Sequence, residues 1–227
     1  LERNQHNVDI HFNHPSIIVW SLGNETKYSK NFDDAYDWIK SQDSSRPVQY
    51  EQAGKTGHAT DIFCPMYYSV SDTKAYATNN SYTKPLIQCE YNHTMGNSGG
   101  NLKDYWELIR KYPKLQGGFD WDFSDQALHL KPDFKANRTV ADYETIASTL
   151  DPGTGQQEKY CYGGVYNKYD PSDNNFNCNG ILGPDRQLNP HAYELAYQYQ
   201  DIWAKALSFT EKGTRVSVYN EYFFRDL

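Results

Sequence analysis

Short apolar runs that end in small or turn residues recur along the first half of the chain. They are rich in aliphatic and aromatic side chains and occupy residues 15–22, 47–51, 61–67, 86–90 and 115–123. The run at 86–90 carries Leu86, Ile87 and Cys89, which is typical of a parallel strand buried on both faces. We therefore predict a strand in each of these ranges.

Amphipathic segments separate these runs. Residues 32–39 and 102–109 place apolar side chains at helical intervals, with acidic residues early and basic residues late, the order that a helix dipole favours. Residues 69–84 predict a weaker helix and a loop, and residues 189–202 predict a further helix. The alternation of strand and helix over residues 15–123 predicts a parallel sheet with helical crossovers.

The second half of the chain follows a different pattern. Residues 124–188 lose regular periodicity and are rich in Gly, Pro, Asn and Asp, so we expect a long loop region kept for function. Residues 206–210 and 214–219 alternate around a turn and predict a hairpin. We therefore predict two domains, an α/β unit over residues 1–203 and the start of a separate β domain over 204–227.

Composition limits the classes of partner. The chain has 227 residues, 38% hydrophobic and 15% aromatic, which is typical of a globular protein. Its net charge of −7 argues against a nucleic-acid partner or an anionic membrane. The 20 tyrosines and five tryptophans either line a sugar site or fill the core, the commoner role. The four scattered cysteines indicate no metal or redox site.

Two glutamates carry the candidate chemistry. Glu25 and Glu90 each follow a predicted strand at its C-terminal end, where barrel enzymes keep their catalytic groups. Glu90 alone could equally be a surface glutamate after an edge strand. Together they suit retaining glycoside hydrolysis, in which two carboxyl groups about 5 to 5.5 Å apart act as nucleophile and as acid/base.

Three sequence blocks carry a resemblance to a known family. Residues 13–25, 89–97 and 116–126 resemble the signature blocks of glycoside hydrolase family 2 β-galactosidases. Further matching positions are Tyr162–Gly164, Phe176, Asn179–Leu182 and Asn189–His191. Related glucuronidases and mannosidases usually differ before Asn24 and after Glu90, which favours the galactosidase subgroup.

The resemblance implies a partial (β/α)8 TIM barrel, strands four to eight, followed by the first hairpin of a β-sandwich, as part of a longer enzyme. It implies retaining hydrolysis of terminal β-galactosides through a covalent galactosyl-enzyme. The alternatives are another family 2 activity, such as β-glucuronidase, and an inactive carbohydrate-binding relative. The parent enzyme is expected to be a homo-oligomer in the bacterial cytoplasm, with the periplasm as the alternative, and the isolated piece is expected to be inactive.

The resemblance also implies roles for individual residues. Glu25 corresponds to the acid/base and Glu90 to the nucleophile. Contacts to substrate fall to Asn24 at the sugar 2-hydroxyl, Tyr67 beside the nucleophile, His93 at galactose hydroxyls, and Trp121 as a pocket wall. From the residues alone, Tyr67 and Trp121 would be core aromatics and His93 a hydrogen-bonded loop histidine.

The resemblance implies two metal sites, and this sequence contains some of the ligands of each. Glu25 corresponds to one ligand of a Mg²⁺ ion whose other protein ligands precede this sequence in the family. The carbonyl of Phe176 and the amide of Asn179 correspond to two ligands of a Na⁺ ion. Oxygen donors suit both hard cations.

The chain departs from the family pattern at Asn92, Thr94, residues 99–101, Asp120 and Val165. Side chains alternate along a strand, so if Trp121 faces the pocket, Asp120 faces the helices. A buried carboxylate without a partner is costly there. We therefore expect Asp120 to destabilise the fold.

Overall fold

The computed structural model describes residues 1–129, 148–150, 157–161 and 173–227. The matching motif Tyr162–Gly164 and the departure at Val165 lie outside these residues. Within the described part, strands and helices alternate through the first half of the chain, so the predicted α/β class is confirmed.

The strands of the first half lie side by side in chain order and all run parallel. Strand β1 (Trp20–Ser21) pairs with β2 (Val48–Gln49), and β3 (Leu86–Tyr91) pairs with β4 (Leu115–Asp120). Residues 62–66 join the two pairs through isolated parallel bridges to β2 on one side and to β3 on the other. This order is that of consecutive strands in a (β/α) barrel.

Several strands are shorter than the apolar runs that predicted them. The run at 15–22 contributes only β1, the run at 47–51 only β2, and the run at 61–67 only single bridges. Side-chain pattern marks the buried segments, but strand length depends on how many backbone groups a neighbour pairs. Among the described residues, β1 has a hydrogen-bonded neighbour on one side only.

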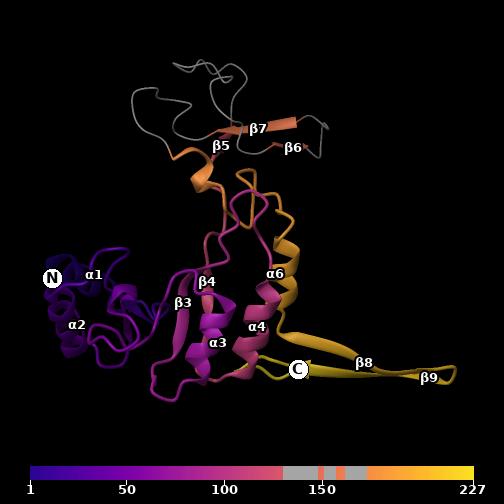
Figure 1. Cartoon of the computed structure of the whole chain (residues 1–227), viewed down its shortest axis with the longest axis horizontal. Coiled ribbons are helices and arrows are strands. Elements are labelled where there is room, and N and C mark those ends of the chain that lie inside the picture. Colours follow the sequence, from indigo (N-terminus) through magenta and orange to yellow (C-terminus); the bar gives the residue numbers. More distant parts are fainter. Residues whose placement is uncertain (130–147, 151–156, 162–172) are drawn as a thin grey trace.

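Helices connect most of the successive strands, and Figure 1 shows α3 and α4 beside β3 and β4. Only the 3₁₀ helix η1 (Glu51–Ala53) lies between β2 and residues 62–66. Helices α2 (Lys30–Gln42), α3 (Val70–Thr78) and α4 (Leu102–Lys111) occupy the predicted positions. Helix α6 (Ala192–Gln198) is shorter than predicted. Helix α1 (Glu2–His11) was not predicted, because only Val8 among its residues is buried and the others are mostly polar.

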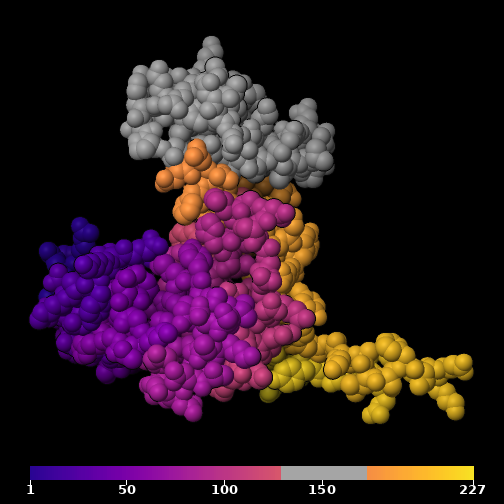
Figure 2. Space-filling view, in the orientation of Figure 1, coloured from indigo at the N-terminus to yellow at the C-terminus, as the bar shows by residue number. Residues whose placement is uncertain are grey.

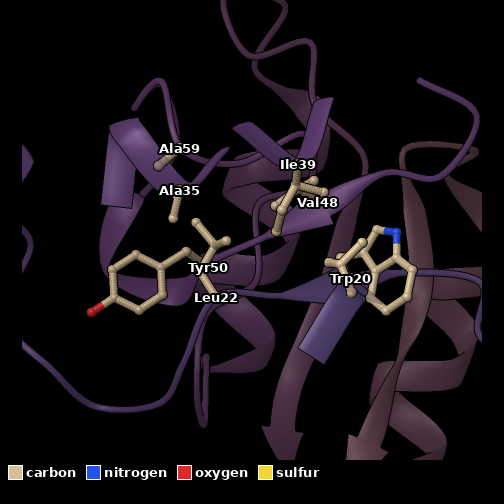
Figure 3. Packing of buried hydrophobic residues seen from close by; sticks show 8 residues of the cluster. Trp20, Leu22, Ala35, Ile39, Val48, Tyr50 and Ala59 are labelled. Carbon is tan, nitrogen blue, oxygen red and sulfur yellow. The ribbon is translucent and has the colours of Figure 1, made fainter. Parts of the chain in front are cut away.

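The first core cluster lies between α2 and the β1–β2 pair (Figure 3). Its buried members are Val8, Trp20, Leu22, Ala35, Ile39, Val48, Tyr50 and Ala59. The Trp20 indole Nε1 donates a hydrogen bond to Asp43 Oδ2 at 2.9 Å, which ties the end of α2 to β1. The cluster therefore fixes the strand that leads to Glu25.

The second core cluster lies between α3 and the β3–β4 pair. It contains Phe63, Tyr76, Ala77, Leu86 and Leu115, all buried. Phe63 comes from the segment 62–66, so this cluster packs the bridging segment against the strand that leads to Glu90. Together the two clusters pack one face of the strand row, which is the parallel arrangement of β1, β2, residues 62–66, β3 and β4.

The remaining elements lie beyond this row. The predicted loop region contains a small antiparallel sheet of β5 (Leu128–His129), β7 (Gln157–Cys161) and β6 (Ser148–Leu150), and the 3₁₀ turn η3 (Asn174–Asn177). The predicted hairpin is confirmed as β8 (Ile202–Thr210) and β9 (Gly213–Asn220). It projects away from the body of the molecule (Figures 1 and 2) and is mostly exposed on both faces.

In the described part of the chain, every helix is too short or too polar to cross a lipid bilayer.

The contacts of Asp43 generate a stability prediction. Burial alone would raise the pKa of Asp43, but hydrogen bonds from Ser45, Trp20 and the Arg46 backbone outweigh it and lower the pKa from 3.8 to about 2. The carboxylate therefore stabilises the fold above about pH 4, and this contribution is lost as the pH falls toward 2. We expect Asp43→Asn to reduce the free energy of unfolding at pH 7 by about 1 to 2 kcal/mol.

Urea denaturation between pH 7 and pH 2 tests this prediction. The exposed Asp9→Asn on α1 is the matched control and should have little effect at any pH. An equal loss for Asp43→Asn at pH 7 and near pH 2 would contradict the assignment.

Candidate active site

Tyr67 and Glu90 form the centre of the candidate site. The Tyr67 hydroxyl donates a hydrogen bond to Glu90 Oε2 at 2.6 Å, and the Tyr67 backbone N–H donates to the Glu90 carbonyl at 2.8 Å. Tyr67 has φ +47°, a left-handed conformation at the end of the bridging segment. This turn lets the backbone and the side chain of one residue both face Glu90, whose side chain is largely buried.

The environment of Tyr67 keeps its hydroxyl protonated. Burial, the hydrogen bond to Glu90, and the negative charges of Glu90 and Glu25 all raise the pKa of Tyr67 above its ordinary value. Tyr67 therefore remains a hydrogen-bond donor at neutral pH. β1 and β3 run parallel in the same set of strands, so the loop after β1, which carries Glu25, and the end of β3, which carries Glu90, lie at the same edge.

The loop that carries Glu25 and Asn24 is exposed but anchored. Glu25 has φ +48°, and its backbone N–H donates to Glu51 Oε1 at 2.6 Å. The Asn24 carbonyl accepts a hydrogen bond from the Thr26 hydroxyl at 3.1 Å. Asn24, predicted to bind the sugar, is exposed in the loop after β1.

Sequence reasoning did not identify Glu51 as a residue of the candidate site. It predicted Glu51 only as the end of a strand. It is a third carboxylate at the C-terminal end of a strand, the same signal that identified Glu25 and Glu90, and it is buried.

A chain of contacts leads from Tyr67 to three further predicted site residues, His93, Asn179 and Phe176. The His93 ring meets the Tyr67 ring edge-on, with centroids 5.7 Å apart. His93 Nε2 lies 2.7 Å from Asn179 Nδ2, and the same amide nitrogen donates to the Phe176 carbonyl at 3.1 Å. A predicted substrate residue and two predicted metal ligands thus form one connected group.

Trp121 lies at the end of the neighbouring strand. Its backbone N–H donates to the carbonyl of Tyr91, the residue that follows Glu90, at 3.0 Å. Its side chain is 39% exposed, so the indole is a partly open surface rather than a core aromatic. This position suits the predicted pocket wall.

Comparison with known proteins identifies the family. The family model described as glycosyl hydrolases family 2, TIM barrel domain, matches residues 1–204. The chain belongs to glycosyl hydrolase family 2. Two β-galactosidases are similar to this family 2 chain: that of Leuconostoc mesenteroides is 39% identical over 99% of the chain and 21% of its own length, and that of Oenococcus oeni is 40% identical over 94% and 20%. The chain therefore spans about a fifth of these relatives.

Solved structures support the fold. A β-glucuronidase from Ruminococcus gnavus, in complex with D-glucuronic acid and in its apo form, superposes with a TM-score of 0.52 in each case. The match covers 88% of the chain and 35% of that enzyme, at 15% identity. At this identity the likeness concerns the fold alone.

The predicted ligands of the two metal ions differ in how well they fit a metal site. Asn179 is 2% exposed, and its Oδ1 is buried without a hydrogen-bond partner. The Phe176 carbonyl lies 3.1 Å from Nδ2 of the same amide, so an unpaired buried oxygen and a carbonyl oxygen, both neutral donors that suit a hard cation, lie close together. For Mg²⁺, the described residues contain no group of three or more His, Cys, Asp or Glu side chains, so Glu25 stands without its co-ligands in this part.

Two departures from the family pattern are partners of each other. Asn92 Nδ2 donates a hydrogen bond to Asp120 Oδ2 at 2.7 Å. The prediction that Asp120 has no partner is therefore wrong for this oxygen, although Asp120 Oδ1 is buried without a hydrogen bond. This hydrogen bond joins the C-terminal end of β3 to that of β4.

Thr94 is a third departure with a structural explanation. It is 4% exposed, and its hydroxyl donates to the Asn179 carbonyl at 2.9 Å and lies 3.0 Å from His191 Nε2. A Cβ on Gly99 would lie 3.0 Å from the Thr94 methyl group, so the glycine leaves room for this side chain. The departures at 94 and 99 therefore fit together.

The incomplete pairing of Asp120 generates a second prediction. Burial raises the pKa of Asp120 from 3.8 to about 6, and the hydrogen bond from Asn92 only partly opposes it. An acid with a raised folded-state pKa destabilises the fold increasingly as the pH rises from about 4 to 6. We expect Asp120→Asn to stabilise the chain by about 1 to 2 kcal/mol at pH 7.5, with the gain disappearing below pH 4.

Thermal denaturation of the chain at both pH values measures this effect. Asn92→Ala should lower stability at pH 7.5, and adding Asp120→Val to it should restore the loss. A pH-independent effect of Asp120→Asn would contradict the burial of this charge.

Proposed function

We propose that this family 2 chain carries both catalytic glutamates of a retaining β-galactosidase. The observation that supports it most is the hydrogen bond from the Tyr67 hydroxyl to Glu90 Oε2, at the strand edge where the loop carrying Glu25 also lies. The similarity to two β-galactosidases over nearly the whole chain favours galactosides as substrates.

The proposed reaction has two steps. Glu90 forms a bond to the anomeric carbon while the glycosidic bond breaks, and Glu25 gives a proton to the departing oxygen. Glu25 then takes a proton from a water molecule, which attacks the same carbon and releases Glu90 and galactose. The Tyr67 hydroxyl orients the Glu90 carboxylate and occupies Oε2, which leaves Oε1 to attack.

Substrate contacts follow from the same arrangement. We assign the exposed Asn24 side chain to the sugar 2-hydroxyl, His93 to other galactose hydroxyls, and Trp121 to the apolar face of the ring. The side-chain amide of Asn179 positions His93 through the 2.7 Å contact between Asn179 Nδ2 and His93 Nε2. These side chains offer hydrogen-bonding or aromatic groups, which suits a sugar.

The metal assignments belong to the same proposal. The Phe176 carbonyl and Asn179 Oδ1 would hold part of a Na⁺ site, and Glu25 would supply one oxygen to Mg²⁺. A bound cation would fix the orientation of these oxygens and balance negative charge. Asn179 links the Na⁺ position to His93, so the ion would act on substrate through that histidine.

The strand row corresponds in this proposal to strands four to eight of the barrel, within residues 1–203. The hairpin in residues 204–227 would begin a β-sandwich. Its exposed apolar side chains, Phe209, Val216 and Val218, suit a face that another sheet covers.

A chimera tests the function. Residues 1–227 would replace the matching segment of the Leuconostoc mesenteroides β-galactosidase. We expect the chimera to hydrolyse aryl β-galactosides, Glu90→Gln to abolish turnover on all of them, and Glu25→Gln to harm mainly substrates with poor leaving groups. The reason is that every substrate needs the nucleophile, whereas an acidic leaving group needs little proton donation.

Activity on aryl β-galactosides and aryl β-glucuronides is measured side by side. A preference for glucuronides would overturn the substrate class, and a folded chimera that binds galactose without turnover would favour a carbohydrate-binding role.

The isolated chain generates a separate prediction. Among the described residues, β1 pairs only with β2 and β4 only with β3, and apolar Ile18 and Phe119 are 73% and 65% exposed. A strand row with open edges does not hold two glutamates at a fixed spacing, and an error of about 1 Å costs roughly a hundredfold in rate. We expect no turnover of a fluorogenic β-galactoside above that of the Glu90→Gln chain; clear turnover would show that this part suffices.

A further inference from the structure

Tyr50 and Glu51 lie directly after β2, between the strand that leads to Glu25 and the segment that ends at Tyr67. Glu51 Oε1 accepts the backbone N–H of Glu25 at 2.6 Å. The Tyr50 hydroxyl donates a hydrogen bond to the carbonyl of Thr26, the next residue along the loop. Two consecutive residues of one strand end thus bind two consecutive residues of the loop that carries Glu25.

Tyr50 gives this attachment a rigid base. It is fully buried in the first core cluster, and its ring stacks on Phe32 of α2 with centroids 3.9 Å apart and planes 13° apart. Its backbone N–H donates to the Thr60 hydroxyl at 3.2 Å. The attachment therefore connects an exposed loop to the first core cluster.

The conformation of Glu25 explains why the loop needs this attachment. A glutamate at φ +48° lies in the left-handed region, which is unfavourable for a residue with a side chain. A hydrogen bond from a backbone N–H to an ionised carboxylate is among the stronger ones, and it opposes relaxation of the backbone at this residue. Relaxation would move the Glu25 carboxyl group, and proton transfer requires that group within hydrogen-bond reach of the departing oxygen.

We propose that Glu51 and Tyr50 are positioning residues for the acid/base, which act on catalysis only by holding the Glu25–Thr26 backbone. This inference rests on the proposed function of Glu25. In this role both residues bind the backbone of the loop and not the substrate. Their removal therefore affects the step that needs proton donation and leaves attack by Glu90 largely intact.

The test uses the same chimera and two β-galactosides, one with an acidic phenol and one with an alkyl leaving group. We expect Glu51→Ala to reduce kcat/KM for the alkyl galactoside about tenfold to a hundredfold more than for the aryl galactoside. Glu51→Gln keeps an acceptor oxygen and should lose less. Tyr50→Phe keeps the ring stacking and should show the same selectivity at smaller size.

Matched controls separate positioning from simple loss of stability. Tyr36→Phe removes a hydroxyl that binds Asp61 at 2.6 Å, and Asp43→Asn alters another buried carboxylate beside the same core cluster. Both should affect the two substrates equally. Melting temperatures of all variants are measured in parallel.

Double variants give the decisive readout. In a Glu25→Gln background, Glu51→Ala should cause no further selective loss on the alkyl galactoside, because its effect acts through the group already removed. If Glu51→Ala alone harms both substrates equally, or if its selective loss persists without Glu25, the positioning role is overturned. If Glu25→Gln itself shows no selectivity, the acid/base assignment fails instead, so the two failures are distinguishable.

Discussion

Parallel pairing of residues 62–66 with β2 on one side and β3 on the other is the interaction on which the rest of the structure depends. Without these bridges the β1–β2 pair and the β3–β4 pair would be separate two-stranded units. Parallel strands place their C-terminal ends at one edge. The bridge from Met66 to Glu90 therefore brings Tyr67, next in the chain, onto the predicted nucleophile.

The polar groups at this edge are paired across strands and loops rather than within them. Asn92 with Asp120 joins two strand ends, and Thr94 with the Asn179 carbonyl joins the loop after β3 to the segment after η3. A buried polar group is costly without a partner, so a polar residue at one of these positions requires another nearby. This accounts for the departures at 92 and 120 as a pair, whereas those at 94 and 99 fit together because Gly99 leaves room for the Thr94 methyl group.

The two predicted catalytic glutamates are held in different ways. Glu90 belongs to a strand, is buried, and receives a hydrogen bond on its own carboxylate. Glu25 is exposed, and its binding partners act on the backbone of its loop. This difference suits the chemistry proposed for them, since a nucleophile attacks from one fixed position, whereas an acid/base gives and takes protons on two different oxygens.

The sequence by itself determined the element types, the parallel order and the two glutamates at strand ends, because hydrophobic period and turn residues are local properties. It did not determine the polar helix α1, the lengths of the strands, or the partner of Asp120, since these depend on residues far away in the chain. The role of Glu51 was also invisible, although its residue type and place at a strand end were in view. Only the tertiary structure decided it, because a hydrogen bond between Glu51 and the backbone of Glu25 requires β1 and β2 to lie side by side.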